Sequence, residues 1–181
     1  MFETEKLKIQ WDGRRRISAP NKSVLYWGPF DDWWNMFGLA GYGMLVGDEG
    51  NYGTALKLFF RERWPDIKSI STVGLAGSDI DWDIIEPIEL PYKYDWIICQ
   101  AVLEHVRDPV SAVKNMALQL NIGGKMYLHS HGPKFAHHRH PLDCYRFMRD
   151  GVIALADLSN CKILDMVWNE KHWLMVAELN S

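Results

Sequence analysis

Apolar and polar positions follow two periods along this chain, and the changes between them predict an α/β fold. Short, largely apolar runs predict strands at residues 43–47, 66–75, 82–85, 95–99 and 125–130. Apolar residues at helical spacing predict helices at residues 54–64, 110–120 and 150–158. Two final runs, 161–168 and 173–179, predict an antiparallel hairpin at the end of the chain.

The first 42 residues follow a less regular pattern. Residues 23–27 are typical of a strand, and residues 30–39 are typical of a short helix with acidic residues in its first turn. The first 22 residues indicate a short strand or an arm. We therefore treat residues 1–42 as an N-terminal extension of a single domain whose core spans residues 43–181.

Two motifs concentrate polar side chains in the second half of the chain. The first, Leu103–Pro109, reads Leu-Glu-His-Val-Arg-Asp-Pro and follows the strand predicted at 95–99. In open α/β sheets, ligands bind at this carboxyl end of the strands. Asp108 and Pro109 provide a cap and a first-turn proline for the next helix. The second motif, His138–Phe147, reads His-Arg-His-Pro-Leu-Asp-Cys-Tyr-Arg-Phe.

With these two motifs in this order, the chain resembles the class I S-adenosylmethionine-dependent methyltransferases, in particular the compact group that is methyltransferase type 11-like. The resemblance implies a Rossmann-like methyltransferase fold: a mostly parallel seven-stranded sheet with a C-terminal antiparallel hairpin and helices on both faces. It implies S-adenosylmethionine as cofactor and a small-molecule or sugar-like methyl acceptor. It also implies that residues 1–42 form a cap over the cofactor, which is an analogy of fold.

The cofactor residues implied by this resemblance begin in the turn after the first core strand, at Gly47, Asp48 and Gly50. The family usually has an acid two residues before the first glycine, where this chain has Leu45. It also has an acid for the ribose hydroxyls at the end of the second strand. Here the nearest candidate is Asp79, for which a loop acid facing water is the alternative.

Further along the chain, the resemblance places Asp83 at the adenine amino group and Ile84 against the ring. Gln100 and Ala101 then run beside the cofactor, with Glu104 and His105 at the mouth of the pocket. The alternatives are a helix cap for Glu104 and a hydrogen-bonded core histidine for His105.

Histidines are concentrated between the two motifs and within the second, at His129, His131, His137, His138 and His140. In one interpretation, His129 and His131 point the same way along a strand and bind zinc or iron with His140 or Asp143. The spacing matches no closed site, so we expect no metal.

In a second interpretation, the loop after strand five lies over the active site, as the resemblance implies. His140, Asp143 and His105 are then the catalytic candidates: they shape the acceptor pocket, and a histidine takes the acceptor's proton. A third interpretation gives the residues around Tyr145–Phe147 only the task of docking this loop onto the core.

Composition limits the expected partners and cellular location of the protein. A net charge of −3 over 181 residues gives no basic footprint for nucleic acid. Three widely spaced cysteines form no disulfide framework, and no run of about 18 apolar residues occurs, so we expect a cytoplasmic protein that does not enter a membrane. Nine tryptophans suit a core, a pocket or an interface, so a homo-oligomer is among the expected partners.

The departures at Leu45 and after residue 75 keep a second function open. In this alternative the chain is a non-catalytic protein of methyltransferase fold, whose cofactor site has decayed and which acts as a binding or assembly partner.

Overall fold

The computed structural model describes residues 14–19, 22–48, 50–139 and 142–181, and only the backbone for 14–28 and 50–52. Residues 1–13, which hold most of the short strand or arm predicted in the first 22 residues, and His140 lie outside this range. The helices are α1 (Gly28–Phe37), α2 (Gly50–Arg63), α3 (Pro109–Leu118) and α4 (Arg149–Leu158). The strands are β1 (Arg14–Ala19), β2 (Lys22–Trp27), β3 (Gly41–Val46), β4 (Ile67–Gly74), β5 (Ile80–Asp81), β6 (Tyr94–Gln100), β7 (Leu120–His131), β8 (Cys161–Trp168) and β9 (His172–Leu179).

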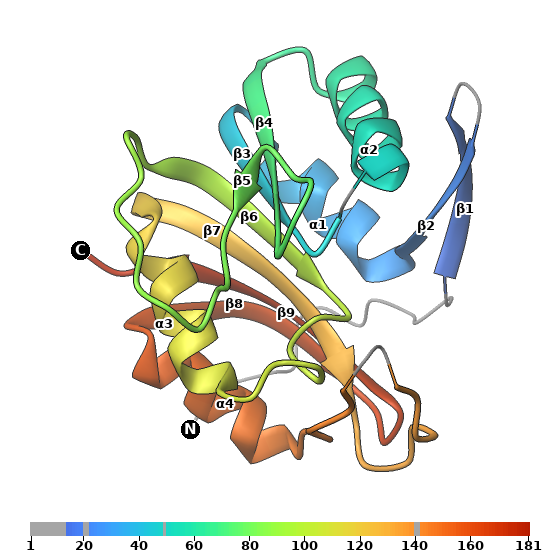
Figure 1. The fold of residues 1–181 in the computed structure, drawn as a ribbon, viewed down its shortest axis with the longest axis vertical. Coiled ribbons are helices and arrows are strands. Elements are labelled where there is room, and N and C mark those ends of the chain that lie inside the picture. The colour runs from blue at the N-terminus through green and yellow to red at the C-terminus, as the bar shows by residue number, and fades with distance from the viewer. Residues whose placement is uncertain (1–13, 20–21, 49, 140–141) are drawn as a thin grey trace.

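Seven of the described strands form one sheet in the order β5-β4-β3-β6-β7-β9-β8 (Figure 1). The first five pair in parallel, and β9 pairs antiparallel with both β7 and β8. This confirms the predicted mostly parallel sheet with a closing hairpin. The strand order reverses at β3, which pairs with β4 on one side and β6 on the other. In such sheets the ligand site lies at this reversal, beyond the carboxyl ends of the strands.

The strand predicted at residues 82–85 was wrong. The short edge strand is β5, two residues earlier, and the chain then turns, with the Glu86 amide donating to the Asp83 carbonyl at 2.9 Å. Trp82 and Ile84 belong to this turn, and both side chains are buried. Their alternation with Asp83 therefore resembled the pattern of a strand. Nor do helices follow every strand, since the described connections from β4 to β5 and from β5 to β6 contain none.

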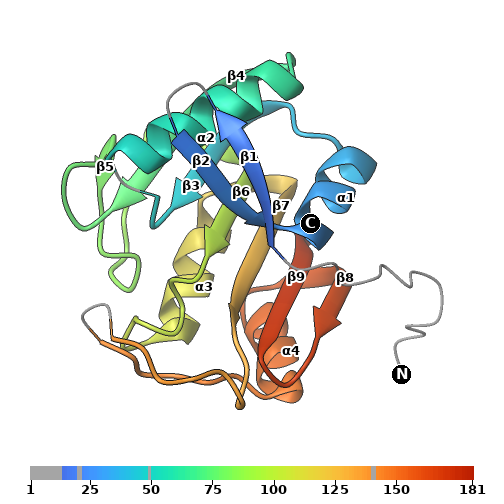
Figure 2. The same cartoon turned by 90° about the vertical axis from the view of Figure 1, so that its right-hand side faces the viewer.

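Residues of the central strands alternate between two apolar cores. Met44 and Val46 of β3 face the core that α3 and α4 cover, whereas Leu45 faces the core that α1 and α2 cover. Figures 1 and 2 show these helix pairs on opposite sides of the sheet. The predicted helices on both faces are therefore confirmed, and Leu45 is explained by packing because its side chain is fully buried in the second core.

Aromatic side chains of α1 fill that second core. Phe30, Trp33 and Trp34 are buried, and the ring centroid of Trp34 lies 4.9 Å from that of Phe60 in α2. The indole Nε1 of Trp33 donates to Asp165 of β8 at 2.8 Å. Helix α1 is thus a core helix, and the β1–β2 hairpin lies beside α2 (Figure 1). The wider prediction of a cofactor cap within residues 1–42 stays a prediction.

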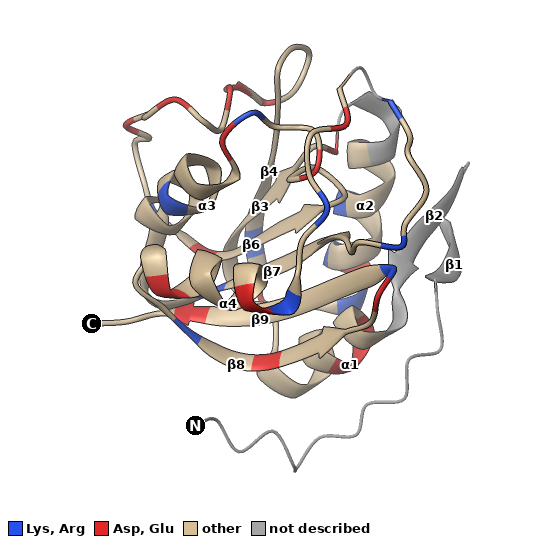
Figure 3. Ribbon diagram, turned by 90° about the horizontal axis from the view of Figure 1, so that it is seen from below, with Lys and Arg blue, Asp and Glu red and all other residues tan. Residues whose placement is uncertain are grey.

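Charged side chains are distributed over many elements of the fold. In the view of Figure 3, both basic and acidic residues occur on helices, strands and loops. Within the described residues, no helix is long and apolar enough to cross a membrane.

Truncating Trp34 tests the packing of α1. Trp34→Ala should lower the free energy of unfolding by about 3–5 kcal/mol, because it removes a large ring from a closed core. Met36→Ala on the same helix, where the side chain is 50% exposed, should change it by less than about 0.5 kcal/mol. Equilibrium denaturant unfolding measures both, and a similar effect of the two substitutions would contradict the described position of α1.

Candidate functional site

A cavity of about 700 Å³ opens at the carboxyl ends of the parallel strands. Its walls come from the ends of β3 and β4, the turn after β5, the segment after β6 and the loop after β7. The lining residues are Val46, Gly47, Val73, Gly74, Leu75, Trp82, Asp83, Ile84, Ile85, Ala101, Val102, His105, Val106, Arg107, His138 and Leu142. Most of these side chains are apolar. The charged or ionisable ones are Asp83 from the turn after β5 and His105, Arg107 and His138 from the segments after β6 and β7. This arrangement is typical of a small-molecule site.

Gly47 closes the wall of the cavity at the end of β3. Its φ of +82° is a conformation that glycine adopts without strain. A Cβ at this position would lie 2.3 Å from Cγ2 of Val102, so no side chain fits. Gly53 in α2 is equally confined, since its Cβ would lie 2.2 Å from the Asp48 carbonyl oxygen. Close packing therefore explains Gly47 and Gly53, and Gly50 is the first residue of α2.

Asp48 is buried next to this turn, and it is not among the residues that line the cavity. Burial raises the pKa of its carboxyl group to about 7. The carboxyl group of Asp48 therefore gains or loses its proton near neutral pH.

Asp79, the predicted ribose acid, is held away from the cavity. Its carboxylate accepts hydrogen bonds from the Thr72 amide at 2.7 Å and hydroxyl at 3.0 Å, and it forms an ion pair with Lys57. Although burial opposes it, these hydrogen bonds hold the pKa of Asp79 below its usual range. The position beside the cavity at the end of β4 is occupied instead by Leu75, which is 72% exposed.

Three of the four residues predicted to contact the adenine ring or to run beside the cofactor line the cavity. Asp83 and the buried Ile84 line the cavity from the turn after β5. Ala101 lines it after β6 with a φ of +54°, and its amide donates to the His129 carbonyl at 2.9 Å. Gln100 ends β6 but is not among the lining residues. Val102, which was not predicted as a site residue, also lines the cavity and lies against Gly47.

Glu104 is a fully buried charge behind the cavity wall. One carboxylate oxygen accepts from the Ser130 hydroxyl at 2.6 Å, and the other lies 3.0 Å from His131 Nε2. Burial opposes ionisation, but His131 and Ser130 lower the pKa of Glu104. Its backbone carbonyl also accepts from the Cys144 amide at 2.7 Å. The helix-cap alternative for Glu104 is wrong, because Asp108 caps α3.

Asp143 fastens the loop after β7. Its carboxylate accepts from the His138 amide at 2.7 Å and from Arg146 Nη2 at 2.6 Å. Arg146 in turn donates to the carbonyl oxygens of Phe135 and Ala136. The Arg146 guanidinium holds the pKa of Asp143 far below its usual range, so Asp143 stays ionised and positions the loop. This favours the docking interpretation for Arg146 and extends it to Asp143, which was predicted as catalytic but is not among the residues that line the cavity.

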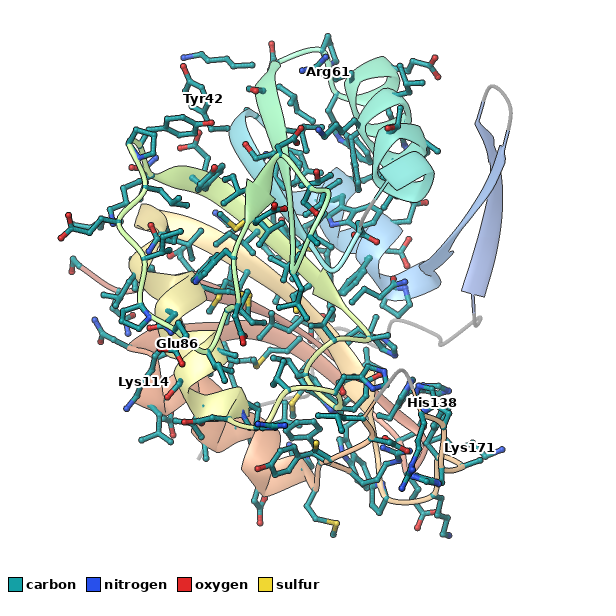
Figure 4. All side chains as sticks on the ribbon, viewed as in Figure 1. Tyr42, Arg61, Glu86, Lys114, His138 and Lys171 are labelled. Atoms are coloured by element: carbon teal, nitrogen blue, oxygen red, sulfur yellow. The ribbon has the colours of Figure 1, made fainter. Side chains whose placement is uncertain are left out.

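Two histidines form the polar side of the cavity. His105 and His138 both line it, with ring centroids 4.9 Å apart. Their Nε2 atoms lie 3.7 and 3.9 Å from a Glu104 oxygen. Burial, followed by the electrostatic influence of His131 and His105, lowers the pKa of His138. Figure 4 shows His138 at the end of the molecule that also carries Lys171, far from Tyr42 and Arg61.

Sequence reasoning grouped His138 with its neighbours but selected His140 as the catalytic residue. Nothing in the composition of the loop ranks one histidine above another. His138 reaches the cavity through contacts of the folded loop, among them the hydrogen bond from its amide to Asp143.

Replacing the buried acid tests its protonation. Because the folded state keeps the Asp48 proton up to about pH 7 and the unfolded state loses it near pH 4, Asp48 contributes stability that is lost as the pH rises toward 7. Relative to Asp48→Asn, the native protein should lose roughly 2–3 kcal/mol of unfolding free energy between pH 5 and pH 8. Denaturant unfolding at both pH values measures this. The same substitution at the exposed Asp66 is the control, and a pH-independent difference for Asp48→Asn would contradict the burial.

Comparison with solved structures identifies the fold. A methyltransferase from Bacillus halodurans matches 83% of this chain and 98% of its own, with a TM-score of 0.65 and 11% identity. The sugar N-methyltransferase KedS8 from Streptoalloteichus matches 78% and 81%, with a TM-score of 0.62 and 15% identity. The N-methyltransferase NodS from Bradyrhizobium japonicum, in complex with S-adenosyl-L-homocysteine, matches 81% of both chains, with a TM-score of 0.59 and 17% identity.

No family model and no curated protein matches this chain. The structural likeness nonetheless agrees with the strand order and the closing hairpin. The chain therefore has the Rossmann-like fold of the S-adenosylmethionine-dependent methyltransferases.

Proposed function

We propose that this protein transfers the methyl group of S-adenosylmethionine to a small molecule, with an amine or hydroxyl of a sugar-like compound as the acceptor. The observation that carries the proposal is the cavity at the carboxyl ends of β3, β4 and β6, at the reversal of strand order in a methyltransferase fold. Its volume of about 700 Å³ lies in the range of small-molecule sites.

The lining residues suit the parts of this cofactor. Asp83 offers a carboxylate to the adenine amino group, and Ile84 offers an apolar surface to the ring. Gly47 lines the cavity at the end of β3, and we assign the methionine end of the cofactor to this position. We assign the ribose to the end of β4 at Gly74 and Leu75.

The chemistry requires the acceptor's lone pair to attack the methyl carbon while the carbon–sulfur electron pair returns to sulfur, which leaves S-adenosylhomocysteine. The acceptor then loses a proton to a base. His105 lines the cavity, and its Nδ1 contacts the Leu142 carbonyl oxygen, so Nδ1 donates and Nε2 is the proton-accepting atom of the neutral ring. The Glu104 oxygen 3.7 Å from Nε2 stabilises the resulting imidazolium.

The acceptor class follows from the polar side of the cavity and from the neighbours. His105, His138 and Arg107 line the cavity together, so polar groups of an acceptor find partners there. Two of the similar structures are described as an N-methyltransferase and a sugar N-methyltransferase. We extend that class to this chain as part of the proposal.

A specific observation also favours the second candidate, a binding protein without catalysis. Among the residues that line the cavity, Asp83 is the one carboxylate, and the end of β4 offers Leu75 where the family has an acid. A hydrogen bond to a charged group contributes about 1.5–3 kcal/mol, so its loss weakens cofactor binding by roughly one to two orders of magnitude.

Calorimetric titration with S-adenosylhomocysteine separates the two candidates. The native protein should bind one equivalent with micromolar affinity, and Asp83→Ala should weaken binding at least about tenfold because the adenine amine loses its acceptor. Glu86→Ala, an exposed acid of the same connection, is the matched control and should bind like the native protein. Folded protein that binds no S-adenosylhomocysteine would support the non-catalytic alternative.

Restoring the missing acid should strengthen binding. Leu75→Asp places a carboxylate at the exposed cavity position after β4, where it can accept from the ribose hydroxyls. Affinity for S-adenosylhomocysteine should rise about tenfold, measured by the same titration. Leu75→Asn, which has similar size without the charge, is the control. Equal affinities of the native protein and Leu75→Asp would contradict the placement of the ribose.

A further inference from the structure

Three histidines on two neighbouring strands present ring nitrogens to one point. His129 and His131 alternate with Ser130 along β7, so they share a face of the sheet. On the antiparallel strand β9, His172 is the direct partner of His131. One nitrogen of each of these rings lies within 4.8 Å of the other two. All three side chains stand on paired strands, which are firmer supports than loops.

The separations of these nitrogens fit ligands of a metal ion. Nδ1 of His131 lies 3.3 Å from Nδ1 of His172, and Nε2 of His129 lies 3.4 Å from the same atom. Hydrogen bonds from N–H groups are usually about 2.7–3.2 Å long. Zinc–nitrogen bonds of about 2.0–2.1 Å in a tetrahedron place neighbouring ligand atoms about 3.3–3.4 Å apart. These two separations match the tetrahedral value, and the nitrogens of His129 and His131 lie within 4.8 Å of each other.

The surroundings of His131 supply the second requirement of a metal-binding imidazole. With Nδ1 directed to His172, its Nε2 lies 3.0 Å from a carboxylate oxygen of Glu104. Metal-bound histidines almost always donate their other ring N–H to such a group, which fixes the ring and raises its basicity. The ring of Phe135 stacks on His131 with centroids 3.6 Å apart and an interplanar angle of 5°. Both partners orient the ring.

Burial distinguishes this group from a chance surface cluster. His129 and His131 are almost completely buried, as is Glu104, and His172 is partly exposed. A second group of candidate ligands, Glu104, His131 and His138, shares His131. It fits less well, because His138 Nε2 lies 3.9 Å from the Glu104 oxygen, while the contact of Glu104 with His131 has the length of a hydrogen bond.

We propose that His129, His131 and His172 bind a zinc ion, with Glu104 as the carboxylate that orients His131. Three neutral imidazoles suit zinc and leave a fourth position for water or another ligand. The proposal departs from the sequence-based expectation of no metal, since the third ligand is His172 rather than His140 or Asp143. It goes beyond methyl transfer and does not rest on it.

The proposed zinc site lies next to the cavity, with His138 between them. The ring of His131 is 5.0 Å from that of His138, which lines the cavity. The same ion would join β7 to β9. Directly beyond these strands, the Gly132 amide already donates to the Lys171 carbonyl at 2.8 Å. Figure 2 shows β9 directly beside β7. Binding of zinc should therefore stabilise the pairing of β7 with β9 at this end of the two strands.

Metal titration of protein without a histidine tag tests the proposal. After removal of metal with a chelator, the native protein should bind one equivalent of zinc with submicromolar affinity, and zinc should raise its melting temperature. His172→Asn and His129→Asn should each lower the affinity at least about 100-fold, because two ligands remain. His137→Asn is the matched control: this histidine lies in the adjoining loop with its side chain 66% exposed, and the variant should bind zinc like the native protein.

Cobalt provides a readout on the unaltered chain, in case a variant fails to fold. Cobalt bound by three imidazoles in a tetrahedral site should give visible absorption bands at one equivalent, and zinc should abolish them. Folded native protein that binds less than 0.1 equivalent of either ion, or a folded His172→Asn variant with native zinc affinity, would overturn the proposal. Titration of the metal-free protein with S-adenosylhomocysteine reports the cofactor site separately.

Discussion

A single buried charge determines how the two halves of the candidate site meet. Glu104 follows β6 and is removed from water, so its carboxylate requires close partners. Ser130 and His131 at the end of β7 supply them, while the Glu104 carbonyl accepts amides from the loop beyond. Because a carboxylate left without these partners would cost several kcal/mol, the end of β6, the end of β7 and the loop are fixed together. The positions of His105 and His138 depend on this arrangement.

The rest of the fold makes a cavity beside that charge. The parallel strands end at one edge, and the connections around β5 are turns whose buried Trp82 and Ile84 pack under the cavity instead of a helix. On the opposite face, the aromatic residues of α1 and α2 fill the second core. The cavity therefore lies at the carboxyl ends of the strands, where none of the described helices covers the sheet. Catalysis by such a site is mainly a matter of proximity, since methyl transfer needs an aligned acceptor and a place for one proton.

Much of this architecture was predictable because its signals are local. Apolar periodicity gave the buried strands and helices, and the Asp108–Pro109 cap gave the start of α3. Gly47 and Ala101 line the cavity because they follow strand ends, whereas Asp83, which the family resemblance singled out, lines it from a turn and not from the strand predicted there. Side-chain contacts that depend on the folded chain were not predictable: Lys57 and Thr72 bind Asp79, and the pairing of β7 with β9 brings His172 to His131. No spacing along the chain encodes either contact.

A crystal structure of the complex with S-adenosylhomocysteine tests the central claim most directly. The account predicts that the adenine lies against Ile84 with its amino group at Asp83, and that the sulfur lies between Gly47 and Ala101, facing His105. The loop fastened by Asp143 and Arg146 should keep its position, because Glu104 retains its partners. A ligand bound elsewhere, or a cavity filled by side chains while the ligand stays in solution, would contradict the assignment of this cavity to methyl transfer.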